Sequence, residues 1–377
     1  MSFLQSKFKE YYSKNDVVLP SDFAFREFAA QKWLSKSYTR HMSFRTRTEV
    51  GEYLRRNAPR HFYYSSARYD NPAAEDMESK GWRSADLTFD IDADHLAGCG
   101  EGTVHVETVE GELASFVDHR CIEEAKLHTL NLIDALTQEL GLSRSQLFIE
   151  FSGHRGFHVT AYLGDNDEYA QADGDVRREI VNYLACVGLD LEALKMELLK
   201  PSLSLRRAAV RPVPVKTVMP GIRGRIARII ARLSALDGKP HLAKLVTSPG
   251  LLIEEEWLQD YESYLERALK YTPIGIDTQV TIDVKRLIRV PLSIHGKTGL
   301  LVKPLDVREL ERFSLTEDLS PFRREDPIRV ELLVSAEKPV SILGHRLKLK
   351  QSTRVSLSAP LAIFLMARGL AIPAGVG

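Results

Sequence analysis

A strictly alternating run of six residues, Leu87-Thr88-Phe89-Asp90-Ile91-Asp92, constrains the fold of this chain more than any other segment. Side chains on a β-strand point alternately to opposite faces. The run therefore predicts a strand that buries its three apolar residues and presents Asp90 and Asp92 together on the other face. Two carboxylates on one rigid strand face suit a hard divalent cation that also binds phosphate oxygens. A merely acidic, exposed strand face is the alternative interpretation.

A second segment predicts a β-hairpin whose tip binds phosphate. The strand-like runs LFIEF and FHVTAYL flank the turn SGHRG, in which Ser152 and Arg155 lie, and His158 follows in the second strand. Two glycines permit a tight turn with exposed backbone N–H groups, and the three side chains add a hydroxyl, a guanidinium fork and a further donor. This combination suits a triphosphate. A plain turn with a solvated arginine is the alternative.

A third candidate strand, residues 274–284, also alternates between apolar and polar residues. Its polar face would carry Asp277 and Asp283, either of which could supply a third metal-binding carboxylate, and periodicity does not choose between them. Four cationic or potentially cationic side chains follow within twelve residues: Arg286, Arg289, His295 and Lys297. A loop that contacts phosphates is one interpretation of this group, and a plain basic loop or an interface is the other.

The length of the chain indicates how these segments are assembled. At 377 residues it exceeds the roughly 250–300 at which one hydrophobic core stops growing, so we expect a main domain and a subdomain. The order of the segments predicts an α+β fold with a mainly antiparallel sheet, formed by residues 1–164 and 273–377. A helical, basic insertion at residues 165–272 would separate these two parts. We expect helices to dominate the first sixty residues.

The charges are balanced overall but segregated along the chain. Lys and Arg number 51, as do Asp and Glu, yet residues 195–245 hold twelve basic residues against Glu197 and Asp237, a local net charge of +10. Such segregation is typical of a protein with one surface that faces a polyanion. A solvated helix face whose charges are neutralised by spatial neighbours is the alternative.

Cysteine content and hydropathy bear on the location of the protein. The three cysteines are too few and too scattered to predict a disulfide framework, and they suit a reducing compartment; they are Cys99, Cys121 and Cys186. The N-terminal segment has charges where a signal peptide carries its apolar core, and the most apolar late stretch contains two prolines and Arg368. We therefore expect a soluble, cytoplasmic protein that does not act at a membrane.

Three of these motifs together resemble the catalytic small subunit of archaeal–eukaryotic DNA primase. They are Asp90-Ile91-Asp92 at the end of a strand, then SGHRGFH, then RLIRVPLSIHGKTG. Supporting pieces are Arg26-Glu27-Phe28, YYSSARY and GWRSADLTFDIDADH, and the C-terminal AIFLMARGLA is similar to archaeal members. The matches extend from about residue 26 to residue 303.

The resemblance implies template-directed synthesis of short oligonucleotide primers from nucleoside triphosphates on single-stranded DNA. It implies a two-metal site with Mg²⁺ or Mn²⁺ on Asp90, Asp92 and Asp277, the last of which lies eighteen residues before His295 as in the family; Asp283 is the second choice. It implies contacts with the triphosphate from Ser152, Arg155, His158, Arg289 and His295. It also implies a heterodimer with the primase large subunit.

The family commonly carries a structural zinc site of Cys and His between the paired aspartates and the next helix. The candidate ligands within residues 95–121 of this chain are Cys99, His105, Asp118 and Cys121. Asp118-x-x-Cys121 resembles a CxxC motif whose first cysteine is replaced, and carboxylate ligation of zinc does occur. The alternative is a loop that folds without metal.

Two other functions stay open on the sequence alone. A related polymerase of the same superfamily would extend existing primers in repair or lesion bypass. A non-catalytic nucleic-acid-binding subunit would use the basic residues 195–245, but it would leave the placement of Asp90 and Asp92 on one strand face unexplained.

Overall fold

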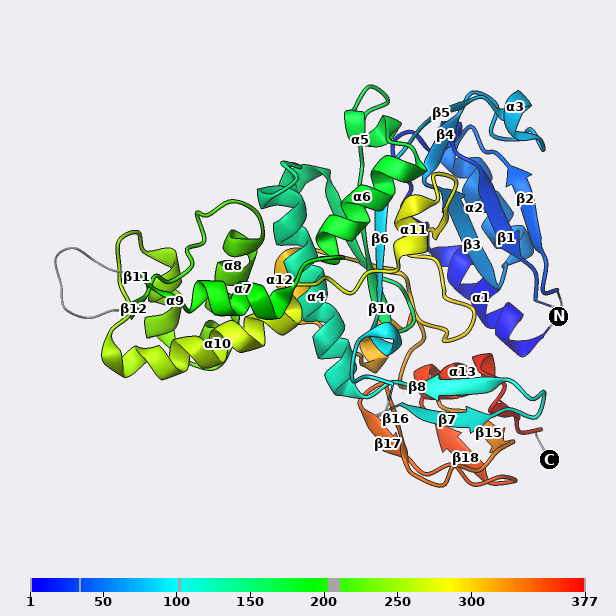
Figure 1. The fold of residues 1–377 in the computed structure, drawn as a ribbon. Coiled ribbons are helices and arrows are strands. Elements are labelled where there is room, and N and C mark those ends of the chain that lie inside the picture. Colours follow the sequence, from blue (N-terminus) through cyan, green and yellow to red (C-terminus); the bar gives the residue numbers. More distant parts are fainter. Residues whose placement is uncertain (1, 34, 101–102, 203–210, 376–377) are drawn as a thin grey trace. The chain divides into compact units, whose positions relative to one another are not determined.

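The computed structural model describes residues 2–33, 35–100, 103–202 and 211–375 and groups them into two compact units (Figure 1). Unit 1 comprises Met1–Lys126, Phe148–Arg177 and Asp277–Gly377, and unit 2 comprises Leu127–Leu147 and Arg178–Ile276. The expected α+β fold with antiparallel sheets is confirmed. The predicted insertion at residues 165–272 overlaps unit 2 without coinciding with it, so the three-part division by position stays a prediction. In the described part of the chain, no helix has the length and apolar character that crossing a membrane requires.

One sheet of unit 1 has the strand order β13-β3-β1-β2, and its strands are Leu287–Arg289, His61–Ser65, Phe28–Gln31 and Tyr38–Met42. Apolar residues of α1 (Phe3–Lys14) and α2 (Arg47–Asn57) join this sheet in one core. The expectation that helices dominate the first sixty residues is therefore wrong for β1 and β2. The edge strand β2 is mostly exposed, so it lacks the apolar alternation that reveals a strand.

A second sheet of unit 1 holds the paired aspartates and has the strand order β14-β9-β10-β6. These strands are Lys303–Leu305, Leu147–Phe151, Gly156–Ala161 and Leu87–Asp92, so the predicted strand and hairpin are both confirmed. In β6 the apolar side chains Leu87, Phe89 and Ile91 are fully buried, whereas Asp90 and Asp92 are partly exposed on the other face. The strict alternation thus has the structural meaning that we expected.

The predicted strand over residues 274–284 is wrong. Thr278–Ile282 instead form a short helix, α11, which begins after Asp277; the Asp277 carboxylate accepts a hydrogen bond from Gln279 N at 2.9 Å. The hydroxyl of Thr281 donates to Thr88 O at 2.8 Å, which fastens α11 to β6 (Figure 1). These capping and tertiary contacts outweigh the β-propensity of the alternating Thr, Val and Ile residues.

The C-terminal part of unit 1 is built around a short apolar helix. This helix, α13 (Ala359–Ala367), is buried along its whole length and contacts β15 and β19. Strand β15 (Ile328–Leu332) pairs antiparallel with β18 (Arg354–Leu357) and β19 (Ala371–Pro373). The other elements of unit 1 described here are β4 (Ala67–Tyr69), β5 (Trp82–Ala85), β16 (Val340–Ile342), β17 (His345–Leu347), α3 (Met77–Lys80), α5 (Glu168–Gln171) and α12 (Val307–Glu311).

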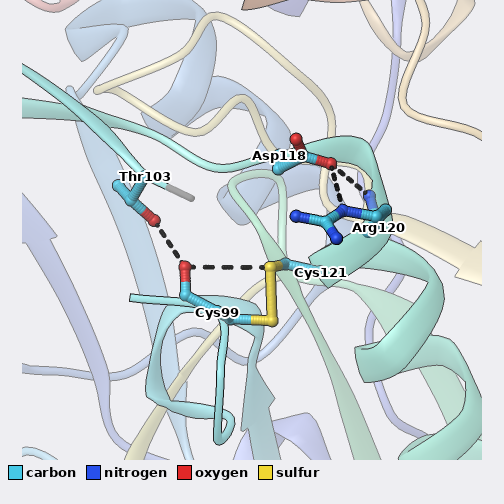
Figure 2. The surroundings of a disulfide bond; sticks show 5 residues. All are labelled: Cys99, Thr103, Asp118, Arg120 and Cys121. Atoms are coloured by element: carbon cyan, nitrogen blue, oxygen red, sulfur yellow. Dashed lines mark hydrogen bonds and ion pairs between the residues drawn. A yellow bond between two sulfur atoms is a disulfide. The ribbon is translucent and has the colours of Figure 1, made fainter. Parts of the chain in front are cut away.

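A hairpin lies between β6 and α4 (His119–Gln138), and a disulfide connects this segment to the first turn of α4. Strands β7 (Val104–Glu107) and β8 (Leu113–Phe116) pair antiparallel, and Cys99 and Cys121 form a disulfide with Cα atoms 5.5 Å apart (Figure 2). Two of the three cysteines thus form a single disulfide, which their positions in the sequence did not predict. Because the hairpin folds the chain back on itself, 22 positions of sequence separation become a covalent contact.

Unit 2 is mainly helical. It contains α7 (Leu191–Leu198), α8 (Gly221–Leu236), α9 (Pro240–Thr247) and α10 (Leu258–Tyr271), together with parts of α4 and α6 (Gly174–Leu184). Its apolar core includes Ile226 and Ile230 of α8 and Leu265 of α10. A two-stranded ladder joins β11 (Pro201–Ser202) and β12 (Arg211–Pro212).

The arginines of α8 are paired with acidic residues of unit 2. Glu139 binds Arg225 at 2.7 Å and Arg228 at 2.6 Å, Asp134 binds Arg232 at 2.5 Å, and Arg223 pairs with Glu197. For α8 the structure thus favours neutralisation by spatial neighbours over a free basic stripe. Arg206 and Arg207, which also contributed to the count, lie outside the described residues.

Candidate active site

The acidic face of β6 lies opposite a buried histidine. Strand β10 pairs antiparallel with β6 so that His158 faces Asp90, and the distance from His158 Nε2 to Asp90 Oδ1 is 3.6 Å. The other ring nitrogen of His158, Nδ1, lies 2.8 Å from Glu150 Oε1 on β9. Burial disfavours a charged imidazole, but the carboxylates of Asp90 and Glu150 outweigh it and raise the pKa of His158. A histidine held between two carboxylates is thus built into the floor of the site.

The carboxylates of β6 have the properties of unfilled metal ligands. Burial, and next the charge of Asp90, raise the pKa of Asp92 to about 6. Asp90 Oδ1 is buried and has no hydrogen-bond partner among the described residues. A divalent cation would satisfy this oxygen and offset the repulsion between the two carboxylates, so the residues fit a metal ion.

A further set of potential ligands continues directly from β6. One ligand atom each from Asp92, Asp94 and His95 lies within 4.8 Å of the others, because Ala93–His95 form a tight 3₁₀ turn after the strand. Asp94 also forms an ion pair with Arg155 at 2.7 Å. Asp94 and His95 are not among the predicted metal ligands, although both lie in the DIDADH run.

The two candidates for the third carboxylate lie at opposite ends of α11. The backbone N–H of Asp277 donates to Asp90 O at 2.8 Å, so this residue is adjacent to β6. Asp283 is exposed and lies on the wall of a cavity of about 400 Å³. The proximity to Asp90 favours Asp277, and its role as the third carboxylate stays a prediction.

Close approach of three segments explains the glycines of the SGHRG turn. Ser152 N donates to Gly156 O at 2.9 Å and closes the turn. A Cβ atom on Gly156 would lie 2.2 Å from Ile91 O, and one on Gly153, whose φ is +79°, would lie 2.8 Å from the Cβ atom of His295. The turn therefore packs directly against β6 and against the His295 loop, as only glycine allows.

The loop that carries His295 packs against the turn through a hydrogen bond and through stacked histidine rings. The hydroxyl of Thr298 donates to Gly153 O at 2.5 Å, and the ring of His295 stacks on that of His154 with a centroid distance of 5.1 Å and an interplanar angle of 7°. His61 contacts His295 edge-on at 4.9 Å. Burial, followed by the charges of nearby cations, holds the pKa of all three histidines well below the ordinary value, so the rings are neutral.

Cations with few carboxylate partners surround these neutral rings, and we call this group the cationic cluster; its members are Arg155, Arg289, Lys297 and Arg368. Arg289 lies over the Tyr63 ring at 5.5 Å. The Nε atoms of all three arginines are buried without a hydrogen-bond partner among the described residues. Among the described ion pairs only Arg155 is compensated, by Asp94, and the positive charge that remains suits an anion with several negative charges.

The structure brings most of the predicted site residues together in unit 1. Asp90, His158 and Arg289 share the wall of the 400 Å³ cavity with Tyr63, and Ser152 and Arg155 lie on the turn that contacts His295. Sequence reasoning missed the other participants: His61, Tyr63, Glu150, His154 and Arg368. His61 and Tyr63 come from β3, Glu150 from β9 and Arg368 from the end of α13, where no local pattern sets them apart; His154 lies within the SGHRG turn but was not given a role.

The four predicted zinc ligands are not gathered into one group in the described part of the chain, and a zinc site there stays a prediction. Zinc binds cysteine as thiolate, whereas the sulfurs of Cys99 and Cys121 are bonded to each other. His105 Nδ1 lies 3.0 Å from Ser115 Oγ, and Asp118 accepts a hydrogen bond from Arg120 N at 2.8 Å (Figure 2).

Comparison with known proteins assigns the family. The family model for the DNA primase small subunit matches residues 89–307, more than half of the chain, and this range contains all three motifs. The chain belongs to the DNA primase small-subunit family. Membership makes it a nucleotidyltransferase of DNA replication, as the resemblance of its motifs implied, and implies in general a partner subunit and DNA binding.

Relatives in the primase family match the chain over nearly its whole length. The DNA primase small subunit PriS of Hyperthermus butylicus is 50% identical over 371 residues, which cover 98% of this chain and 96% of the relative. The PriS proteins of Aeropyrum pernix and Archaeoglobus fulgidus are 36% and 35% identical, with at least 92% of each relative covered. Among solved structures, the polymerase domain of Mycobacterium tuberculosis ligase D in complex with DNA aligns with 81% of this chain at 12% identity and a TM-score of 0.38.

Proposed function

We propose that the chain synthesises short oligonucleotide primers from nucleoside triphosphates on a single-stranded DNA template. The observation that carries this proposal is the juxtaposition of two carboxylates on one face of β6 with the cationic cluster, which together suit a metal-bound triphosphate. Family membership supports a replication role over an unrelated phosphoryl transfer.

Asp90, Asp92 and Asp277 would hold two divalent cations, Mg²⁺ or Mn²⁺. Bound there, the cations would neutralise the charge that develops on the attacking and leaving oxygens. Asp94 is the less suitable third ligand because Arg155 already engages its carboxylate at 2.7 Å. The oxygen of Asp90 that lacks a hydrogen-bond partner and the raised pKa of Asp92 support this placement.

Ser152, Arg155, His158, Arg289 and His295 would bind the triphosphate and orient it for in-line attack of a 3′-hydroxyl on the α-phosphorus. Because Glu150 accepts the Nδ1 proton of His158, the Nε2 atom of that ring faces the acidic strand. In neutral His295, Nδ1 accepts a hydrogen bond from Lys297 N at 3.3 Å, so the proton resides on Nε2, where it can be donated to a phosphate oxygen.

We also propose that the partner subunit is the primase large subunit and that the complex works in the cytoplasm on single-stranded DNA. The near-full-length match to proteins named as small subunits supports a dedicated large subunit.

The test is primer synthesis on single-stranded DNA with labelled nucleoside triphosphates and Mg²⁺ or Mn²⁺. Short products from the chain without a supplied primer, absent in Asp90→Asn, would support the proposal. Asp70→Asn serves as the matched control, because Asp70 is an exposed carboxylate that pairs only with Arg83 among the described ion pairs. Products only from a supplied primer, even with the large subunit added, would favour a repair-type polymerase; template binding without synthesis would favour a non-catalytic subunit.

A further inference from the structure

Arg368 is a member of the cationic cluster to which the proposed function assigns no role of its own. It follows the last residue of α13, a wholly buried apolar helix, and it is far in sequence from the three motifs. Its guanidinium connects two other segments of unit 1, because Nη1 donates to Ser115 O on β8 at 2.7 Å and Nη2 lies 2.7 Å from His154 Nε2 in the SGHRG turn. Core packing explains the apolar residues of α13, but it does not explain why a charged guanidinium follows them and connects two other segments.

The surroundings of Arg368 hold its guanidinium in place without neutralising it. The guanidinium carbon lies 5.1 Å from the ring centroid of Phe116 and 4.8 Å from that of Phe364. In the described part of the chain no carboxylate pairs with it, and burial together with the charge of Arg155 lowers its pKa to about 9. The side chain therefore stays cationic at neutral pH in a fixed position, which is the condition for orienting a neighbouring group.

That neighbour is His154, whose orientation Arg368 determines. Arginine only donates hydrogen bonds, so His154 Nε2 must accept, and the proton of the neutral ring resides on Nδ1. The ring of His154 in turn lies flat on that of His295, the proposed phosphate ligand. Arg368, His154 and His295 thus form one continuous row that ends at a proposed phosphate ligand.

We propose that Arg368 is a positioning residue for the triphosphate, which through His154 holds the SGHRG turn and His295 in the arrangement that binds the phosphates. This inference rests on the proposed function and deepens it, because it names a residue from the C-terminal part that supports the same site. Both Nη atoms of Arg368 are engaged by protein atoms, Ser115 O and His154 Nε2, so we assign it an action through its neighbours and not on the reacting atoms.

The test compares Arg368→Gln and Arg368→Lys with the wild type in steady-state synthesis by the full chain with its partner subunit. Arg368→Gln should raise the KM for nucleoside triphosphate about tenfold, as expected for the loss of one charged hydrogen bond, with little change in kcat. Arg368→Lys should recover part of the affinity, because the ammonium keeps the charge but cannot bridge both acceptors. Arg354→Gln is the matched control, because Arg354 lies in the same C-terminal part, is exposed and pairs with Glu331.

The values of KM, kcat and the thermal midpoint distinguish a positioning role of Arg368 from a purely structural one. A KM equal to that of the wild type in folded Arg368→Gln would overturn the inference, and so would a fall in kcat alone. If Arg368→Gln does not fold, Arg368→Lys is the deciding variant. A raised KM for nucleoside triphosphate with an unchanged thermal midpoint supports the inference. An unchanged KM overturns it. A wild type that makes no triphosphate-dependent product would instead contradict the proposed function.

Discussion

His158 faces Asp90 across the β10–β6 pair and is bound from behind by Glu150, with its two ring nitrogens 3.6 Å and 2.8 Å from the respective carboxylates. The row runs from a fully buried acid through a histidine to the face that would hold the metal ions. Burial raises the pKa of Glu150, and its second oxygen has no hydrogen-bond partner among the described residues, so its position is costly unless it serves His158.

We expect Glu150→Gln to weaken triphosphate binding while the fold is retained. The amide has the same shape but no charge, so it holds the His158 ring less firmly and no longer favours its protonated form. The KM for nucleoside triphosphate should rise by roughly tenfold, the effect of one lost charged hydrogen bond. Steady-state kinetics measure this, with Glu331→Gln as a partly exposed control on β15. Equal KM values for Glu150→Gln and the wild type would show that Glu150 is only a core residue.

Asp92 should make the metal-free protein less stable as the pH rises. Its pKa is about 6 in the folded state and near 3.9 when unfolded, so its stabilising contribution is complete below about pH 4 and is lost as the pH rises through about 6. Asp92→Asn should therefore be more stable than the wild type at pH 7 in chelator, by about 2–3 kcal/mol, and no more stable at pH 4. Denaturant unfolding of both proteins at the two pH values tests this. A difference that does not vary with pH would contradict the assignment.

The contact between Gly156 and β6 predicts a steric effect. Because a Cβ atom would lie 2.2 Å from Ile91 O, Gly156→Ala must push the turn away from the paired aspartates. We expect a loss of about 1–3 kcal/mol in the free energy of unfolding and a large loss of synthesis. Gly164→Ala is the matched control, since no atom lies within 4 Å of a Cβ built there. Full activity of Gly156→Ala would mean that the turn need not lie against β6.

Hydrophobic periodicity predicts a strand correctly where buried and exposed residues alternate. It does not predict site residues that come together from distant segments. The residues of β6 repeat with a period of two, which predicts the strand; the β9–β10 hairpin, whose second strand is buried at every position, is predicted by two strand-like runs around a glycine turn. Asp277 was assigned to a strand because Thr, Val and Ile alternate after it, whereas its own capping bond and the bond from Thr281 to Thr88 favour a helix. Arg368 approaches His154 across 214 positions, and no local pattern encodes such a contact.

The disulfide between Cys99 and Cys121 predicts sensitivity to reductant and not to chelator. It closes a loop of 22 positions that contains the β7–β8 hairpin, on which Arg368 depends through Ser115. In the chain-entropy view a loop of this size stabilises the folded state by about 3 kcal/mol. The midpoint of thermal unfolding should therefore fall by several degrees in reductant or in Cys99→Ser. Adding EDTA at pH 7 should not change the size of the fall that reductant causes. Cys186→Ser is the control, because Cys186 is a free thiol and should leave the shift intact. A midpoint that falls in chelator and not in reductant would show that the two cysteines bind a metal instead.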